Sequence, residues 1–258
     1  MSERKQNPRK MPASVTQGSR VLGKTSGRFA GLYACEKTIG ISTHESLLEK
    51  AVGQLASFDP RVVSVKAQPF TIDVVTGHLL HSNEEVLAHR KTRDKSAVKL
   101  REYTPDFLLG LMGGGRLIVE VKDERFMGVE SYWVKVEKAK RILLMNGYSF
   151  VVVVMKYELS HPLVQNADLL TGFSKNSRIE LSATQIETLE SALLDHPLEL
   201  GTVCTRLGLG LRESPVLLLS GLVAADLTES RLCAKTLVRL AHGDLSHLSL
   251  LSLAGEQT

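Results

Sequence analysis

The chain has 258 residues, of which 43% are apolar and 23% charged, so it is long enough and apolar enough to bury one large core or two small ones. No apolar run approaches the roughly 18 residues of a membrane span, and the basic N-terminus lacks the apolar segment of a signal peptide. We therefore expect a cytosolic protein without contact to membranes. The three cysteines lie far apart with no C-x-x-C pair, which argues against a disulfide framework or a structural zinc site.

The formal net charge of +4 is unevenly distributed along the chain. The first 28 residues carry seven Lys or Arg against one Glu, residues 29–179 carry twenty against seventeen acids, and residues 180–258 carry five against ten. A polyanion is therefore expected to lie along the first two thirds of the chain. Residues 1–28, rich in Ser, Gly and Pro, predict a flexible basic arm, which is either a solubilising tail or a segment that contacts phosphates.

The first regular element expected is a helix that begins within residues 41–55, with Ser42 or Thr43 as its N-cap. Its apolar stripe consists of Leu47, Leu48, Val52 and Leu55. Glu49 adjoins this stripe and can point toward a neighbouring sheet edge, and Glu45 is the alternative for that position. The Phe-Asp-Pro sequence at 58–60 ends the helix, and residues 61–75 predict one or two strands with a bend at Gln68.

Residues 77–101 form a charged insertion that is longer than a tight hairpin requires. It carries the basic residues Arg90, Lys91, Arg93, Lys95, Lys99 and Arg101, diluted by three acids. Either this hairpin lies along DNA phosphates or it is a solvated charged loop.

The clearest pattern lies in residues 103–122, which predict two antiparallel strands joined by a turn at the glycines 113–115. Because side chains alternate along a strand, Glu120 and Lys122 share one face and the valines beside them take the other. The pairing brings Asp106 alongside them. The sequence therefore predicts two carboxylates and an ammonium at one edge of a sheet.

This group of charges suits phosphodiester hydrolysis. Carboxylate oxygens hold Mg²⁺ or Mn²⁺, which acidifies the attacking water and stabilises the charge on the phosphorus centre. Lys122 orients that water or neutralises the same charge. Because unpaired charge is unfavourable within apolar strands, the occurrence of both halves at hairpin spacing favours a catalytic role over a solvated surface pair.

After the hairpin, residues 129–147 predict a helix that ends at Gly147, with Val134, Ile142 and Met145 among its buried residues. Its outer face offers Lys135, Lys138 and Arg141, of which the two lysines are candidate DNA contacts. The apolar run at 148–155 predicts a strand buried on both faces and therefore central in the sheet. Helix, strands, helix and strand in this order predict an α/β layer with a mixed sheet flanked by helices.

We place a domain boundary near residue 178, where the composition changes. Residues 182–195, 197–208 and 212–222 predict three helices, the first with Ser182 and Gln185 at capping-box spacing, and residues 224–227 and 235–240 predict a short hairpin. Three helices and a hairpin are typical of a winged helix. The third helix offers only Arg212 as a donor and this part of the chain is acidic, so we expect it to dock a protein partner rather than read DNA, or to be purely structural.

Several of these motifs resemble known nucleases. Pro105-Asp106 and Glu120-Val121-Lys122 resemble the PD-(D/E)xK superfamily. A longer series resembles the TnsA family, the endonuclease subunits of heteromeric cut-and-paste transposases, over residues 27–156. In chain order the series is G-R-F-A-G-L-Y, K-x-x-G, E-S-L-L-E, F-D-P-R-V, Q-P-F, Y-T-P-D-F and E-V-K.

The resemblance implies a restriction-endonuclease-like nuclease domain over residues 29–177 and a winged-helix-like docking domain over residues 178–258. It implies that Asp106 bridges two Mg²⁺ or Mn²⁺ ions, that Glu49, Glu120 and the carbonyl of Val121 complete the ligand set, and that Lys122 assists the water.

The implied substrate is the double-stranded DNA of transposon ends, of which one strand is cut, at the 5′ end of the element, in the bacterial cytosol or nucleoid. The implied partners are a DDE-type transposase subunit, which cuts and joins the other strand, and an AAA+ ATPase regulator that docks on the C-terminal domain. Two alternatives stay open: a free-standing restriction or repair nuclease, and a non-catalytic DNA-binding scaffold subunit.

Overall fold

The computed structural model describes residues 31–33, 37–39, 42–92, 101–156, 158, 160–174 and 180–253. Its helices are α1 (Leu47–Phe58), α2 (Asn83–Lys91), α4 (Glu130–Met145), α5 (Pro162–Ser174), α6 (Ala183–Leu193), α7 (Leu200–Leu207) and α8 (Pro215–Leu219). Its strands are β1 (Gly31–Tyr33), β2 (Ser42–His44), β3 (Val62–Ala67), β4 (Thr71–Asp73), β5 (Leu79–Leu80), β6 (Glu102–Tyr103), β7 (Phe107–Leu111), β8 (Arg116–Asp123), β9 (Ser149–Met155), β10 (Leu198–Glu199), β11 (Val223–Ala224) and β12 (Leu237–Leu240). Short 3₁₀ turns are η3 (Glu124–Phe126), η4 (Leu211–Glu213) and η5 (Ser246–Leu248). Within these ranges no helix is both long and apolar enough to cross a membrane.

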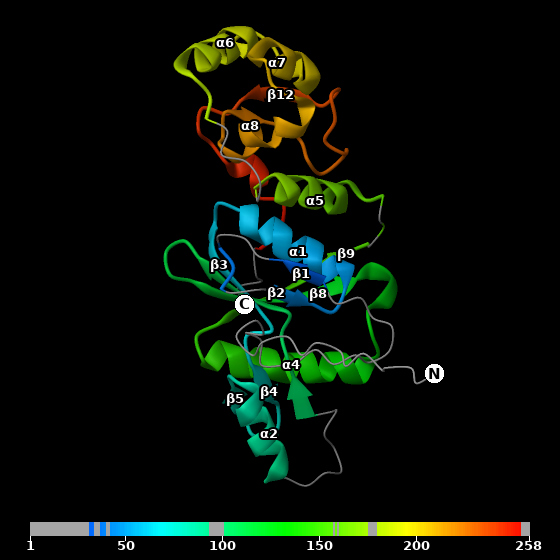
Figure 1. Ribbon diagram of the computed structural model, residues 1–258. Coiled ribbons are helices and arrows are strands. Elements are labelled where there is room, and N and C mark those ends of the chain that lie inside the picture. The colour runs from blue at the N-terminus through cyan, green and yellow to red at the C-terminus, as the bar shows by residue number, and fades with distance from the viewer. Residues whose placement is uncertain are drawn as a thin grey trace, which may run out of the picture.

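The central layer is a four-stranded sheet with the order β3-β7-β8-β9, in which β9 runs parallel to β8 and the other neighbours are antiparallel. Helix α1 covers one face, with α5 beyond it, and α4 covers the other face (Figure 1). The prediction of an α/β fold with a mixed sheet flanked by helices is confirmed.

The hairpin of β7 and β8 forms where the alternation predicted it. Val119 and Val121 pack in the apolar cluster that contains α1, whereas Ile118 packs in the cluster that contains α4. The turn between the strands uses Gly113 and Gly114 with φ of +83° and +87°, a left-handed conformation that glycine adopts without a steric penalty. Glu120, two residues beyond Ile118, therefore lies on the α4 face.

The position predicted for the strand at 148–155 is wrong. Among the described strands β9 pairs only with β8 and lies at the edge of the sheet, and the side chain of Val154 is 46% exposed. An apolar run shows that a strand is covered, but not whether a strand or a helix covers it. Here α4 and the C-terminal segment that includes Leu251 lie along this edge.

Two helix details also differ from the prediction. The N-cap of α1 is Ser46, whose hydroxyl accepts a hydrogen bond from the Glu49 amide, because Ser42 and Thr43 belong to β2 and pair with β1. In α4 the buried residues are Val136, Ala139 and Leu143, whereas the predicted Val134 and Met145 are 51% and 87% exposed. The buried stripe of α4 thus lies on a different side of the helix from the one expected.

The insertion contains a helix, α2, that its sequence did not predict, because Val86 is its only buried residue. Strands β5, β4 and β6 form a small antiparallel sheet beside it. Buried Asp73 on β4 connects this sheet to α2, because its Oδ2 lies 2.7 Å from Nε2 of His89. The same oxygen accepts a hydrogen bond from Arg101 at 3.2 Å. Burial alone would raise the pKa of Asp73, but its hydrogen bonds with His89, the backbone amides of residues 75 and 76 and Arg101 hold that pKa well below its ordinary value.

The C-terminal part contains α6, α7, α8 and the three-stranded antiparallel sheet β10-β12-β11 around a second apolar cluster. The predicted capping box of Ser182 and Gln185 is confirmed. The final described residues leave this cluster and return to the first one, where Leu251 and Leu253 are buried beside α1 and β3. The carbonyl of Leu251 accepts a hydrogen bond from Arg61 at 2.8 Å.

Candidate active site

Asp106 lies directly before β7, at the end of the hairpin register. Phe107 pairs with Val119, so the backbone of Asp106 runs beside that of Glu120 on β8. The amide of Val121 donates to Asp106 Oδ2 at 2.7 Å. This bond orients the Asp106 carboxylate along the strand that carries Glu120 and Lys122.

Glu120 is only 3% exposed and receives three donors from the part of the chain that the structure describes. The hydroxyl of Tyr103 donates to Oε2 at 2.6 Å, and the hydroxyl of Tyr132 donates to Oε1. Lys122 Nζ lies 2.9 Å from the same Oε1. A buried carboxylate with these partners is well satisfied, because hydrogen bonds to a charged group are stronger than those to a neutral one.

Lys122 lies between Glu120 and an aromatic ring. Its ammonium is 4.1 Å from the ring centroid of Tyr132, and Lys135 is 5.6 Å from the same centroid. Burial lowers the pKa of Lys135. Lys135 therefore lies beside the candidate site rather than on the outer face of α4.

Glu49 occupies the first turn of α1, and both of its carboxylate oxygens contact the start of its own helix. Oε2 accepts from the Glu45 amide at 2.8 Å and Oε1 accepts from the Ser46 hydroxyl at 2.9 Å. These are the contacts of a helix-capping glutamate. Of the two alternatives, Glu49 is the carboxylate whose charge acts on Asp106.

The electrostatics of the site join all three carboxylates. Burial and the charges of Glu120 and Glu49 raise the pKa of Asp106 well above its ordinary value, against the opposing effect of the Val121 amide and Lys122. Burial also raises the pKa of Glu49, to which the charges of Glu45 and Glu120 contribute. Carboxylates such as Asp106 and Glu49, whose pKa is raised by burial and by neighbouring negative charges, are typical of functional sites.

The donor chemistry of these residues fits a hard divalent cation, since they offer only oxygen atoms. Their arrangement does not hold one: within the described ranges, no group of three His, Cys, Asp or Glu side chains is placed so that it could bind a metal ion. Glu120 is held by the hydroxyls of Tyr103 and Tyr132, whereas Glu49 is held by Glu45 and Ser46 at the start of α1.

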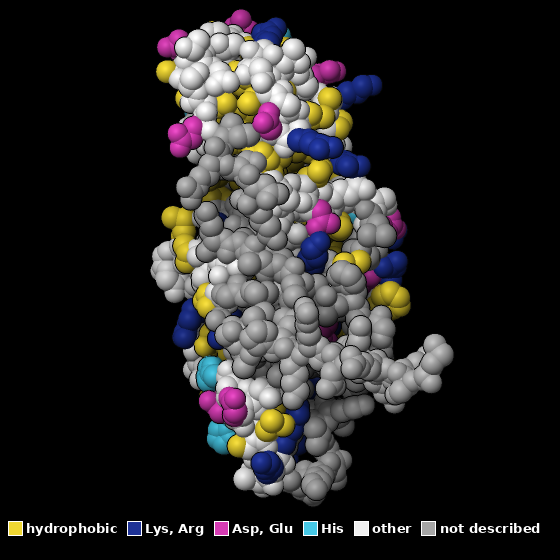
Figure 2. All heavy atoms as spheres, in the orientation of Figure 1, with side chains coloured by type: hydrophobic (Ala, Val, Ile, Leu, Met, Phe, Trp, Pro, Cys, Tyr) yellow, Lys and Arg dark blue, Asp and Glu magenta, His cyan; other side chains and the backbone are white. Residues whose placement is uncertain are grey.

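Apart from Lys135, the predicted DNA contacts divide into three groups. Arg90 and Arg101 form ion pairs with Glu102 and Asp73, whereas Lys91 and Lys138 are exposed. Arg93, Lys95 and Lys99 lie outside the described residues. Figure 2 shows histidine, acidic and basic side chains together at the end of the molecule where α2 and β5 lie, so the described part of the insertion carries mixed charge.

Sequence reasoning missed Tyr103 and Tyr132. Tyr103 stands within the quoted motif Y-T-P-D-F, three residues before Asp106, and its position on a strand next to the hairpin could have signalled an inward side chain. Tyr132 lies in the first turn of α4, and its approach to Glu120 depends on how that helix packs against the sheet. No local pattern in the sequence gives that packing.

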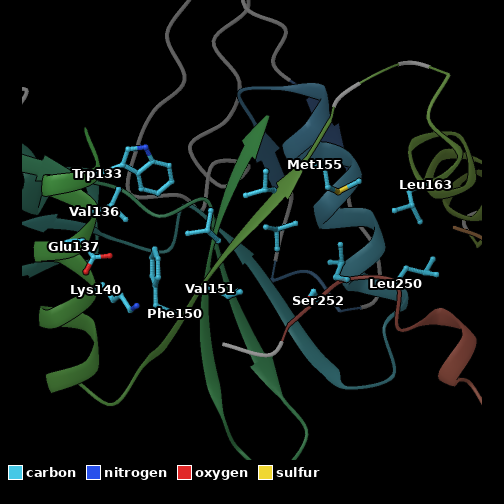
Figure 3. A pocket seen from close by; sticks show the side chains of 14 residues that line it. Trp133, Val136, Glu137, Lys140, Phe150, Val151, Met155, Leu163, Leu250 and Ser252 are labelled. Carbon is cyan, nitrogen blue, oxygen red and sulfur yellow. The ribbon is translucent and has the colours of Figure 1, made fainter. Parts of the chain in front are cut away.

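A groove of about 690 Å³ runs along β9, between Trp133 and Lys140 of α4 on one side and Leu163 and Leu250 on the other (Figure 3). None of the four predicted catalytic residues lines it. The candidate active site and the groove are therefore separate places on the sheet.

Comparison of the chain with models of protein families gives no match, and comparison with curated proteins gives none either.

Proposed function

We propose that the chain is a metal-dependent DNA endonuclease of the PD-(D/E)xK type that cuts one strand at the ends of a mobile element, as the catalytic partner of a DDE-type transposase. The observation that carries the proposal is the convergence of Asp106, Glu120 and Lys122 from one β-hairpin, with the charge of Glu49 near enough to act on Asp106. The mixed sheet between α1 and α4 is compatible with this class of nuclease.

The residues of the chain have distinct tasks in this proposal. Asp106, Glu49, Glu120 and the Val121 carbonyl would hold Mg²⁺ or Mn²⁺, which supplies an acidified water and a positive charge at the phosphorus centre. The ammonium of Lys122, held by Glu120, lies where it can orient the attacking water or neutralise the phosphate. Attack of the water on phosphorus breaks the bond to the 3′ oxygen, which takes up a proton, and leaves a 5′-phosphate and a 3′-hydroxyl.

The acidic C-terminal part is proposed to be a winged-helix-like module that docks the AAA+ ATPase regulator. Its third helix, α8, buries Leu217 and Leu218 completely, so these side chains are not presented to a DNA groove. The excess of acids over bases in residues 180–258 would repel a duplex.

A second candidate, a non-catalytic DNA-binding subunit, is favoured by one observation. The three carboxylates are each satisfied by donors of the chain and are not arranged around a common ion position. A free-standing nuclease has no comparable support.

A strand-specific cleavage assay separates these functions. The substrate is a duplex that carries an end of the element encoding the chain, with each strand labelled, in the presence of Mg²⁺ and the transposase and ATPase subunits. We expect Asp106→Asn to lower cutting of one strand by about a hundredfold or more and to leave the other strand's cut intact. Asp123→Asn, which changes the next acidic residue after Lys122 on the same strand, is the control and should cut within about twofold of the wild type. Equal cutting of both strands by the Asp106 variant would rule out the catalytic assignment.

A further inference from the structure

The lone pairs of Glu120 are nearly all occupied by the chain itself. A carboxylate offers about four acceptor positions on its two oxygens. Tyr103 occupies one on Oε2, and Tyr132 and Lys122 occupy two on Oε1. An ion that binds Oε1 must therefore exchange with one of these two donors.

The two tyrosines differ in how firmly the fold holds them. Tyr103 on β6 is 3% exposed and is part of the apolar cluster under α4. Tyr132 is only partly buried at the margin of that cluster, in the first turn of α4. This turn lacks a side-chain cap at Val129 and follows Gly128, whose φ is +85°. A helix start without a cap opens more easily than a buried strand.

Release of Tyr132 breaks the contacts of its ring with two lysine ammonium groups, but it separates no ion pair. Lys122 and Lys135 both lie over its ring, at 4.1 and 5.6 Å. When the phenol leaves Glu120, it loses one hydrogen bond and gains contact with water, and it stays neutral. If Lys122 left instead, a charged group would lose its carboxylate partner, which is the less favourable exchange.

We infer that Tyr132 closes the carboxylate site, so that a divalent cation reaches Glu120 Oε1 in exchange for the Tyr132 hydroxyl, whereas Tyr103 is a positioning residue that orients Glu120 with or without the ion. This inference rests on the proposed function, and it accounts for the orientation of Glu120, which the hydroxyls of Tyr103 and Tyr132 hold. It makes opposite predictions for the two tyrosines.

The test measures Mn²⁺ binding to the full chain by titration calorimetry. Removal of a competing hydroxyl in Tyr132→Phe should tighten binding by about tenfold, and loss of the orienting hydrogen bond in Tyr103→Phe should weaken it by about tenfold. Tyr148→Phe is the matched control, because Tyr148 belongs to the same apolar cluster but its ring lies under Arg116. This control should bind Mn²⁺ within about twofold of the wild type. Unchanged or weaker binding by Tyr132→Phe overturns the inference.

A second readout uses the wild-type chain alone and does not depend on any variant folding. Trp133 is the only tryptophan of the chain, and its ring lies 5.4 Å from that of Tyr132 in an edge-on contact. Release of Tyr132 should change the Trp133 emission on addition of Mg²⁺, with the same midpoint as Mg²⁺ binding measured by calorimetry. Ion binding without any change in emission overturns the inference.

The same titrations distinguish failure of the inference from failure of the proposed function. If Mn²⁺ binds to the wild type and is lost in Asp106→Asn, the metal site stands, and only the sign of the Tyr132→Phe effect decides the role of Tyr132. If neither the wild type nor Tyr132→Phe binds Mn²⁺, the metal-dependent function and the inference both fail.

Discussion

Replacing Asp106 with asparagine should make the folded chain more stable at neutral and alkaline pH. Asparagine keeps the shape of the side chain. Its carbonyl oxygen can still accept the hydrogen bond that the Val121 amide donates to Asp106 Oδ2 at 2.7 Å in the wild type. What the substitution removes is a carboxylate whose pKa is raised by burial and by the charges of Glu120 and Glu49. The gain in stability therefore measures the electrostatic strain of the candidate site.

The pH dependence of this effect has a definite sign. In the unfolded chain the carboxyl group ionises at about pH 4, whereas in the folded chain it keeps its proton to higher pH. Between these two pKa values the folded chain binds one more proton than the unfolded chain, so its stability falls as the pH rises. The contribution of Asp106 is fully present below about pH 4 and is lost as the pH rises through the pKa of the folded state.

Each unit by which this pKa is raised corresponds to about 1.4 kcal/mol at high pH. We expect Asp106→Asn to raise the free energy of unfolding by about 1–3 kcal/mol at pH 8, which for a chain of this size is a rise in Tm of roughly 2–10 °C. The difference should shrink toward zero near pH 4.

Thermal unfolding followed by circular dichroism at pH 4, 6 and 8, with a chelator present, measures these differences. Glu190→Gln, which changes an exposed carboxylate on α6, is the control and should stay within about 0.5 kcal/mol of the wild type at every pH. If Asp106→Asn is no more stable than the wild type at pH 8, or if its gain is the same at all three pH values, the carboxylates do not strain the site.

Two further predictions concern the parts around the site. Leu251→Ala should lower the free energy of unfolding, measured in urea, by about 2–4 kcal/mol, because Leu251 is buried in the first apolar cluster. The control Leu194→Ala, at a residue that is 74% exposed, should change this free energy by less than about 0.5 kcal/mol. Equal effects of the two substitutions would mean that the C-terminal segment does not pack against the first cluster. Asp73→Asn should destabilise the chain by about 1–3 kcal/mol at pH 7, because it weakens the contacts with His89 and Arg101. Because the pKa of Asp73 is lowered, its contribution is present above about pH 4 and is lost as the pH falls, so acid titration of both proteins should bring their stabilities together, and a constant difference down to pH 2 would contradict the role of its charge.

The sequence predicted those elements whose pattern is local. The alternation of residues 117–121 predicted the two faces of β8, and the turn glycines predicted the β7–β8 hairpin. The capping box at Ser182 was predictable for the same reason, since two residues at fixed spacing define it.

Features that depend on packing between distant segments were not predictable in this way. The edge position of β9 depends on whether a second strand pairs beside it, which an apolar run does not reveal. Which residues of α4 are buried depends on how the helix is rotated against the sheet. Helix α2 has one buried apolar residue and therefore almost no periodic signal. At the candidate site, Asp106, Glu120 and Lys122 came from one hairpin, whereas the contact of Tyr132 with Glu120 joins two elements whose packing no short motif encodes.

The return of the chain to its first apolar cluster has a mechanical consequence. Helix α5 contributes Ala167 to the first cluster and Leu170 to the second, and the segment from Leu250 to Leu253 contacts the first cluster again after leaving the second. Two parts of a protein that are joined by one connecting segment can rotate relative to each other in any direction. When two segments connect them, the easiest relative motion is a rotation about the line that joins the two connections. A force applied to the C-terminal part would therefore be transmitted to α1 and β3, against which the returning segment packs.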